Sequence, residues 1–177
     1  QGGYHSYRIP ALVHLPSGTV LAFCEARKYT GRDHDEIDLV LRRSEDGGQT
    51  WAELQIVVES SGKTCGNPCP IVDRDTGRVH LLFCKNNQWV FINHSADEGR
   101  TWSEPEEITA QAKDPAWSFV GTGPGHGIQL STGRLLAPCW SDESPGPLTW
   151  APNPNWGKIQ SSYALYSDDH GQTWHHS

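Results

Sequence analysis

The stretch SEDGGQTW at residues 44–51 recurs twice along the chain, as SADEGRTW at residues 95–102 and as SDDHGQTW at residues 167–174. The three copies share the pattern Ser-x-Asp-x-Gly-x-Thr-Trp, which we call the Asp box. Its Asp can accept hydrogen bonds from backbone N–H groups in the turn, its Gly permits the bend, and its Trp covers the adjacent sheet. The same pattern occurs in proteins with no shared chemistry. We therefore interpret the Asp box as a structural turn and not as a metal or sugar site.

A second pattern alternates with the Asp box. It is a short apolar strand, a Ser/Thr-Gly turn and a second apolar strand that ends in Cys, and it occupies residues 11–24, 71–84 and 128–139. Gly at the turn supplies the positive φ that a tight hairpin needs. Each repeat therefore contains two hairpins, and thus four strands.

The strands between these turns are short and rich in Val, Ile, Leu, Phe and Trp. We expect them at residues 8–14, 19–27, 37–44, 51–58, 69–73, 78–84, 89–95, 102–108, 125–130, 134–140 and 161–167, with a last strand beginning at Trp174. No segment predicts a convincing amphipathic helix. Successive four-stranded antiparallel units are typical of an all-β fold, the β-propeller. The expected blades span about residues 8–58, 67–108 and 123–177.

Composition excludes several classes of protein. The chain has 177 residues, a formal net charge of −7 and 36% hydrophobic residues, which suits about one domain with a core. Its apolar runs are short, so we expect no transmembrane helix. A negative balance without a Lys/Arg block argues against nucleic acid or an anionic membrane as the main partner.

The 5 cysteines cannot all pair with one another, and we expect free thiols. Cys24, Cys84 and Cys139 recur at one place in the repeat, which indicates small buried side chains. Cys65 and Cys69 could pair, although the prolines on either side of Cys69 restrict that loop. The chain begins without Met, so we expect a trimmed start. The missing signal peptide therefore leaves a secreted, lysosomal or cytoplasmic location open.

Strand alternation predicts where the loops lie. In an up-and-down sheet the first and third turns share one end, so the Ser/Thr-Gly turns and the Asp boxes form one rim. The opposite rim carries four long irregular segments, at residues 28–36, 59–68, 109–124 and 141–160. Uneven loops on a regular scaffold are where binding sites usually lie. The start of the first strand, at Arg8, and the end of the second, at Arg27, both open onto this rim.

Five short motifs, in this order, resemble the exo-α-sialidases (neuraminidases) of the bacterial and animal type. They are YRIP at residues 7–10, EAR at 25–27, Asp33, NPCP at 67–70 and GPGH at 123–126, together with the Asp boxes. The resemblance covers essentially the whole chain. The family propeller has six blades, so three repeats account for about half of it, and the chain resembles an N-terminal portion.

The resemblance implies a site for a terminal sialic acid, whose anomeric carbon bears a carboxylate. Arg8 matches the first member of an arginine triad that binds this group, and a guanidinium suits a carboxylate because it donates two charge-assisted hydrogen bonds. Arg27 matches a second substrate-contacting arginine, and Glu25 is a candidate to orient Arg8 or Arg27. Asp33 matches the acid/base, which requires a raised pKa. Asp35 is the alternative acid.

Other positions on this rim have weaker assignments. Asn67 matches a contact to the substrate's N-acyl group. Trp140 falls where relatives often carry a Tyr beside the glycerol or aglycone, although core packing explains it nearly as well. Asp142 departs from aromatic-lined relatives, and His126 is more simply a structural histidine. No His cluster has metal-ligand spacing, so we expect no catalytic metal and no cofactor.

Sialidases use a tyrosine nucleophile in place of a second carboxylate. In the family that Tyr, its Glu and two further arginines lie beyond residue 177, and none of the five tyrosines here matches. We therefore expect a retaining exo-α-sialidase acting on sialylated glycoproteins, glycolipids or oligosaccharides, with little activity in this chain alone. The missing half or a second copy would cover its open sheet faces. The alternative is a non-catalytic Asp-box propeller that binds glycan or protein.

Overall fold

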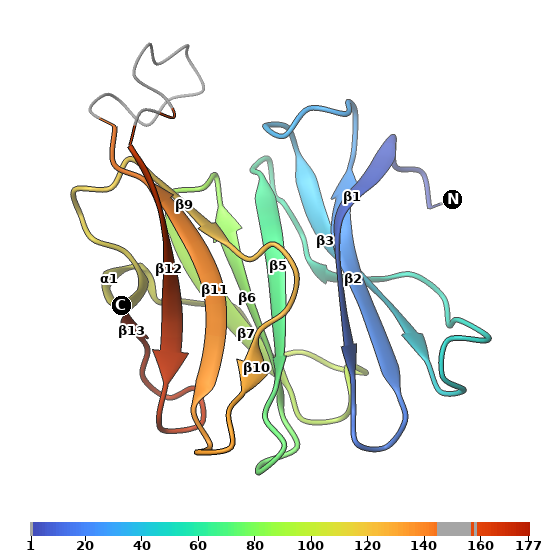
Figure 1. Cartoon of the computed structure of the whole chain (residues 1–177). Helices are drawn as coiled ribbons and strands as arrows, with labels where there is room; N and C mark the ends of the chain where they lie inside the picture. Colours follow the sequence, from blue (N-terminus) through green and yellow to red (C-terminus); the bar gives the residue numbers. More distant parts are fainter. Residues whose placement is uncertain (1, 145–156, 158) are drawn as a thin grey trace.

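The computed structural model describes residues 2–144, 157 and 159–177, and its strands form three antiparallel sheets (Figure 1). The first sheet contains, in order, β1 (Ser6–His14), β2 (Val20–Arg27), β3 (Ile37–Ser44) and β4 (Gln55–Val58). The second contains β5 (Cys65–Val72), β6 (Val79–Lys85), β7 (Trp89–Ser95) and β8 (Glu106–Glu107). The third contains β10 (Ile128–Gln129), β11 (Leu135–Asp142), β12 (Gln160–Ser167) and β13 (His175–His176), with β9 (Phe119–Thr122) also paired to β11. The expected all-β architecture of four-stranded antiparallel units is confirmed.

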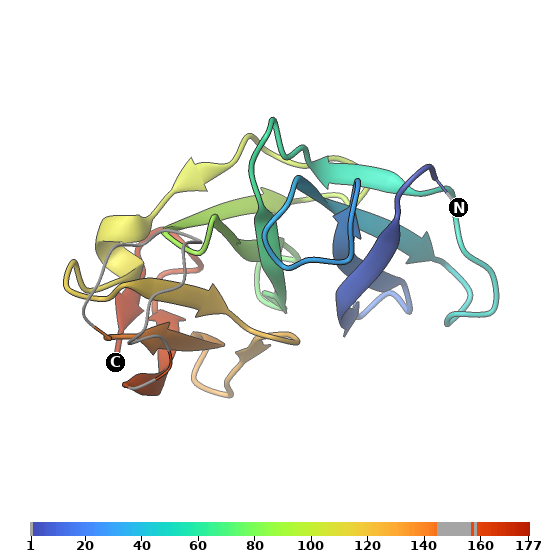
Figure 2. The same ribbon diagram turned by 90° about the horizontal axis from the view of Figure 1, so that it is seen from above.

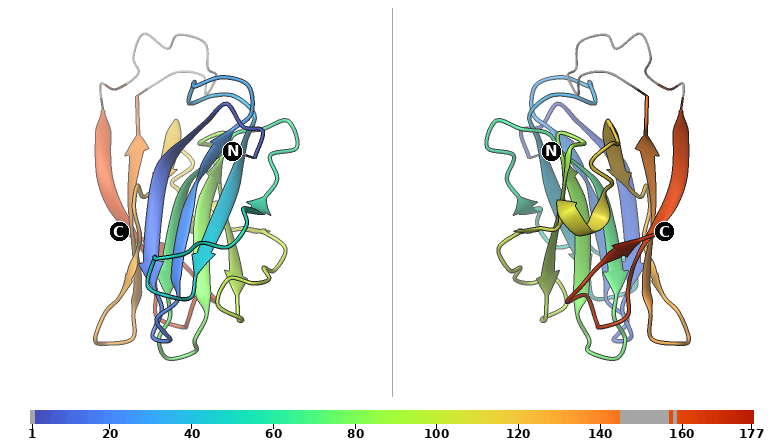
Figure 3. Two further views of the ribbon diagram at one scale, coloured as in Figure 1. Left: turned by 90° about the vertical axis from the view of Figure 1, so that its right-hand side faces the viewer. Right: turned by 90° about the vertical axis from the view of Figure 1, so that its left-hand side faces the viewer.

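The three sheets follow one another in an arc, as the view from above shows (Figure 2). The first strands of the sheets are neighbours, since β1 packs beside β5 and β5 packs beside β9 and β10. The long axes of the strands run from one rim to the other (Figure 3). Residues at the start of β1 and in the first half of β5 are thereby brought close together.

The second sheet is buried on both faces. Leu81 of β6 packs with Leu21 and Phe23 of the first sheet, whereas Leu82 packs with Ala137 and other residues of the third. Successive residues of a strand point to opposite faces, so one apolar run supplies two cores. This explains why residues 81–84 read as continuous hydrophobic sequence instead of alternating.

The Asp boxes and the Ser/Thr-Gly turns share one rim, as expected, and they join neighbouring sheets. In each box the Asp accepts a hydrogen bond from the Thr backbone N–H, at 2.8–2.9 Å. The fourth box position adopts a left-handed φ and reaches the preceding sheet: Glu98 accepts from Thr19 at 3.0 Å, and His170 contacts Asp73 at 3.0 Å. The first box has Gly47 there, which has no side chain to reach outward.

The sequence misplaced several boundaries. β5 begins at Cys65, four residues before the expected 69, because its first part continues past an irregularity in the register with β6. The expected strand at residues 125–130 is shortened to β10, and an additional strand, β9, lies before it in the segment expected as an irregular loop. A cis Gly123–Pro124 bond lies between the two strands. A four-residue helix, α1 (Thr109–Ala112), lies in the segment expected as loop. In the described part of the chain, no helix is long and apolar enough to cross a membrane.

All five cysteines are free thiols, and four of them are buried. Cys65 and Cys69, which the sequence left open as a pair, belong to two different apolar clusters. They act as small core side chains, in agreement with the prediction.

We expect acid lability from His80, which is 3% exposed beneath the third Asp box. Burial lowers its pKa from 6.5 to about 4, against the opposing charge of Asp73. The unfolded chain therefore binds a proton that the folded chain does not, and the free energy of unfolding decreases as pH falls from about 6.5 to about 4, by roughly 3 kcal/mol in total. Urea unfolding at several pH values should show this slope in the wild type and a reduced slope in His80→Leu. Equal slopes would contradict the assignment.

Candidate functional site

One carboxylate oxygen contacts two arginines at the rim of long loops. Asp33 Oδ1 lies 2.9 Å from Nη1 of Arg8 and 2.7 Å from Nη2 of Arg27. Arg8 comes from β1 and Arg27 from the end of β2, while Asp33 lies in the loop between β2 and β3. The side chains of Arg8 and Asp33 are half or more exposed, whereas that of Arg27 is 1% exposed. The three residues thus form a carboxylate-binding arrangement that opens to solvent.

Glu25 positions the guanidinium of Arg27 from the buried side of the site. Its Oε2 accepts from Arg27 Nη2 at 2.8 Å, and its side chain is 5% exposed. Arg27 Nη1 donates to the carbonyl of Gly31 at 2.6 Å, which ties the loop to β2. The sequence left open whether Glu25 orients Arg8 or Arg27, and the structure pairs it with Arg27. Burial raises the pKa of Glu25, and its hydrogen bonds to Arg27 and to Asn67 N–H oppose that effect.

The pKa of Asp33 is lowered, which differs from the raised pKa that the sequence analysis required of an acid/base. Burial by itself would raise the pKa, but the hydrogen bond and charge of Arg27 and the charge of Arg8 outweigh it. The acidic neighbours of Asp33 in sequence face elsewhere: Asp35 accepts from Thr30 at 2.7 Å, and Glu36 accepts from Lys28 at 2.7 Å. The expected crowding of negative charge is therefore replaced by two cations.

The backbone is irregular at two points beside Glu25. In β1 the register with β2 shifts between Arg8 and Ala11, where Ile9 has a φ of 54°. In β5 the register with β6 shifts between Gly66 and Cys69, where Asn67 has a φ of 57°. A left-handed φ is uncommon for a β-branched residue, and such strain clusters at functional sites. These bulges set the directions of the side chains at the mouth of the site.

Asn67 joins the site through Glu25. Its backbone N–H donates to Glu25 Oε1 at 3.0 Å, so this carboxylate bridges Arg27 and Asn67. The Asn67 carbonyl accepts from Thr122 Oγ1 at 2.7 Å, and its side-chain Oδ1 accepts from Asn87 Nδ2 at 3.0 Å. The sequence analysis did not identify Thr122 or Asn87. An Asn-Asn pair after a strand signals only a turn, and nothing local indicates which strand it faces.

Three other rim residues of the sequence analysis lie outside this network. Trp140 packs on Phe119, with ring centroids 4.4 Å apart, and lies over Gly121, which faces it across the sheet. Its neighbour Cys139 faces the second sheet, so Trp140 points to the opposite face. Asp142 is fully buried and accepts from the N–H groups of Ser144 and Gly157, both at 2.8 Å. His126 is exposed near the opposite end of β5.

Comparison with known proteins identifies the family of this chain. Residues 18–177 match a family model described as a BNR repeat-like domain. Human sialidase-3 is 35% identical over 97% of this chain and 45% of its own length, and an exo-alpha-sialidase of Aspergillus fumigatus is 32% identical over 84% and 46%. The chain belongs to the BNR-repeat sialidase family. It spans about half the length of the curated relatives that it matches.

Solved sialidases share the fold. A Hadza microbial sialidase, Hz136, superposes with a TM-score of 0.85 at 29% identity, covering 98% of this chain and 37% of that one. Trypanosoma rangeli sialidase superposes with a TM-score of 0.76 at 22% identity, which supports the fold alone, over 98% of this chain and 30% of that one. The three sheets therefore match part of a sialidase propeller.

One further cluster of this sialidase homologue has metal-ligand residue types. Asp73, Asp75 and His170 bring ligand atoms within 4.8 Å of one another. However, Asp73 Oδ1 accepts from Gln129, and Oδ2 accepts from Thr76 and contacts His170 Nδ1 at 3.0 Å. Its oxygens are already used to hold the second sheet to the third. We interpret this cluster as a structural link.

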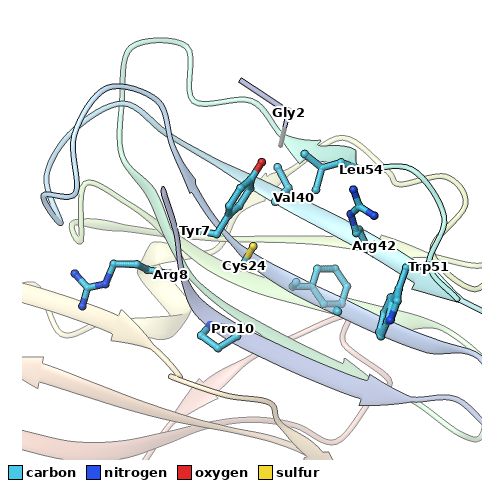
Figure 4. A pocket seen from close by; sticks show the side chains of 11 residues that line it. Gly2, Tyr7, Arg8, Pro10, Cys24, Val40, Arg42, Trp51 and Leu54 are labelled. Atoms are coloured by element: carbon cyan, nitrogen blue, oxygen red, sulfur yellow. The ribbon is translucent and has the colours of Figure 1, made fainter. Parts of the chain in front are cut away.

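A pocket of about 460 Å³ lies on the face of the first sheet that is turned away from the second. Tyr7, Cys24, Val40, Trp51 and Leu54 are among the residues that line it (Figure 4). Arg8 borders the pocket, but its guanidinium extends to the other side of β1 from Tyr7 and Trp51 (Figure 4). This is the alternation expected of successive strand residues. The pocket is thus distinct from the Arg8–Asp33 site.

Proposed function

We propose that this chain forms part of a retaining exo-α-sialidase, in which Arg8 binds the carboxylate of a terminal sialic acid and Asp33 is the acid/base. The observation that carries the proposal is the contact of Asp33 Oδ1 with both Arg8 and Arg27. The two guanidinium groups therefore already hold a carboxylate, that of Asp33 itself. Arg27 is buried and held by Glu25, so this half of the site is rigid before substrate arrives.

The lowered pKa of Asp33 fits the proposed reaction if substrate binding changes the partners of Asp33. A sialic acid carboxylate that binds Arg8 displaces Asp33 from that guanidinium. Asp33 then loses one cation and gains an anionic neighbour, and both changes raise its pKa. The protonated Asp33 would donate its proton to the glycosidic oxygen as the bond to the anomeric carbon breaks, and its carboxylate would later take a proton from the attacking water. The tyrosine nucleophile of this scheme lies outside the chain.

The proposal is tested by Arg8→Ala in the full-length protein, with a fluorogenic sialoside as substrate. A charged hydrogen bond to the substrate is worth about 1.5–3 kcal/mol, so we expect KM to increase by about 10- to 100-fold. Arg32→Ala is the matched control, because Arg32 is another exposed arginine on the same loop. It has no ion pair to Asp33 among the contacts of the described residues. Its KM should stay near that of the wild type.

Two outcomes would count against the proposal. If the wild-type protein binds sialosides without releasing sialic acid, the chain belongs to a non-catalytic propeller. If Arg8→Ala and Arg32→Ala change KM equally, Arg8 contributes only to the general positive charge of the rim.

A further inference from the structure

The loop that carries Asp33 is anchored through its backbone on both sides of that residue. Arg27 Nη1 donates to the carbonyl of Gly31 at 2.6 Å, two residues before Asp33. Thr64 Oγ1 donates to the carbonyl of Asp35, also at 2.6 Å, two residues after it. Arg27 belongs to the first sheet, whereas Thr64 directly precedes β5 of the second. The loop is therefore held by one donor from each sheet.

Thr64 is itself fixed by residues of both sheets, and it is only 5% exposed. Its backbone N–H donates to Asn86 Oδ1 at 2.9 Å, and its backbone carbonyl accepts from Asn86 N–H at 2.8 Å. Thr64 also forms an isolated parallel bridge with Ile37, the first residue of β3. The Thr64 hydroxyl is thus placed by the turn between β6 and β7 and by the start of β3.

The side chain of Asp33, in contrast, relies on a partner for which the substrate competes. It is 62% exposed, and its carboxylate contacts Arg8 and Arg27. In the proposed reaction the sialic acid carboxylate binds Arg8 and displaces Asp33 from it. The position of the Asp33 carboxyl group then depends more strongly on the loop backbone, which is held at Gly31 and Asp35.

We propose that Thr64 is a positioning residue, whose hydrogen bond to the Asp35 carbonyl keeps the Asp33 carboxyl group within reach of the glycosidic oxygen when substrate binds. This inference rests on the proposed function, with Asp33 as the acid/base. A general acid acts only within hydrogen-bond reach of the oxygen that it protonates, so a small displacement of the loop slows the reaction. The bond uses the backbone carbonyl of Asp35 and is therefore independent of the Asp35 side chain.

The test is Thr64→Val in the full-length protein, which replaces the hydroxyl by a methyl group of similar size. Two substrates are compared, a natural sialoside and a nitrophenyl sialoside, whose leaving group needs little protonation. We expect kcat for the natural sialoside to fall about 3- to 10-fold more than kcat for the nitrophenyl sialoside, because the lost bond positions the acid. KM should change by less than about twofold, because Arg8 and Arg27 still bind the substrate.

Two further variants separate the missing hydroxyl from a general loss of stability. Thr64→Ser keeps the donor, so the ratio of its two kcat values should match that of the wild type. Thr19→Val is the matched control, since Thr19 is also 5% exposed and donates between sheets, to Glu98 at 3.0 Å, but on the opposite rim. Urea unfolding should show a loss of stability in both Val variants, whereas only Thr64→Val should change the ratio.

If Thr64→Val does not fold, Asn86→Gly replaces it. This change removes the Oδ1 that accepts from Thr64 N–H, and glycine tolerates the left-handed φ of 50° at this position. A smaller shift of the ratio in the same direction is expected, because the Thr64 hydroxyl is then less firmly placed.

The outcomes separate this inference from the proposed function. A wild-type protein that releases sialic acid from neither substrate overturns the proposed function and this inference with it. An active wild type whose Thr64→Val variant loses activity equally on both substrates, or on neither, overturns the inference alone. A Thr64→Ser variant that behaves like Thr64→Val also overturns it. A ratio that falls in Thr64→Val and returns in Thr64→Ser supports it.

Discussion

Asp33→Ala in the full-length protein is expected to reduce kcat for natural sialosides by about 10²- to 10⁴-fold, the usual contribution of a general acid. A sialoside with a good leaving group, such as a nitrophenol, should lose much less, because its glycosidic oxygen needs little protonation. The ratio of the two losses is the measurement. It separates proton donation from a merely structural role, which would reduce both rates alike.

Asp35→Ala is the control for this experiment and also tests the alternative acid. Asp35 lies on the same loop, but its carboxylate accepts from Thr30 Oγ1 at 2.7 Å and from the backbone N–H of Glu36 at 2.8 Å. These bonds lower its pKa, the one from Thr30 most, and they hold the loop. We therefore expect Asp35→Ala to affect the two substrates equally. A leaving-group dependence in Asp35→Ala, and none in Asp33→Ala, would exchange their assignments.

Arg27→Met is expected to lower the free energy of unfolding by about 3–5 kcal/mol, as found when one partner of a buried ion pair is removed. The Arg27 side chain is 1% exposed and lies 2.8 Å from the Glu25 carboxylate, which is 5% exposed. Without the guanidinium, the hydrogen bonds of Glu25 to the residues that the structure describes are reduced to the one from Asn67 N–H, at 3.0 Å. Urea unfolding of the full-length protein measures the loss.

The pH dependence of this variant has a defined sign. Burial already raises the pKa of Glu25, and Arg27 is among the groups that oppose the rise, so its removal raises the pKa further. A carboxyl with a higher pKa in the folded state binds a proton more tightly when folded. Part of the lost stability should therefore return as pH falls through that pKa. A double variant, Arg27→Met with Glu25→Gln, should be more stable at neutral pH than Arg27→Met. If it is not, the uncompensated carboxylate is not the cause.

The sequence could predict which distant residues form the site only because the four-stranded unit repeats. The Asp boxes and Ser/Thr-Gly turns have a local cause, since each turn is closed by side chains within eight residues of one another, as in residues 44–51. Alternation then assigns every loop to a rim. That is why Arg8, Arg27, Asp33 and Asn67 were expected at one mouth. In the structure Asp33 contacts both arginines, and Glu25 contacts Arg27 and Asn67.

What alternation could not predict are the contacts between sheets and the directions of side chains at irregularities. The sequence analysis placed Asp33 among acidic neighbours, whereas the fold turns it toward two arginines and lowers its pKa. It left Trp140 open between a substrate contact and core packing, and the structure packs the Trp140 ring on Phe119. The direction of Asp33 could not be predicted because a loop changes the direction of a side chain without leaving a mark in the local pattern.

The sequence by itself determined the four-stranded repeat, the order of the strands and the rim on which the charged residues lie, because hairpin turns and the two-residue period of a strand are properties of neighbouring residues. Only the tertiary structure decided that Glu25 pairs with Arg27, that Asn67 adopts a left-handed φ, and that Asn87 and Thr122 hold it from the turn after β6 and from β9. The contacts of Asn67 with Asn87 and with Thr122 join residues 20 and 55 positions apart. They exist only after the strands of the second sheet have paired and the third sheet has packed against it.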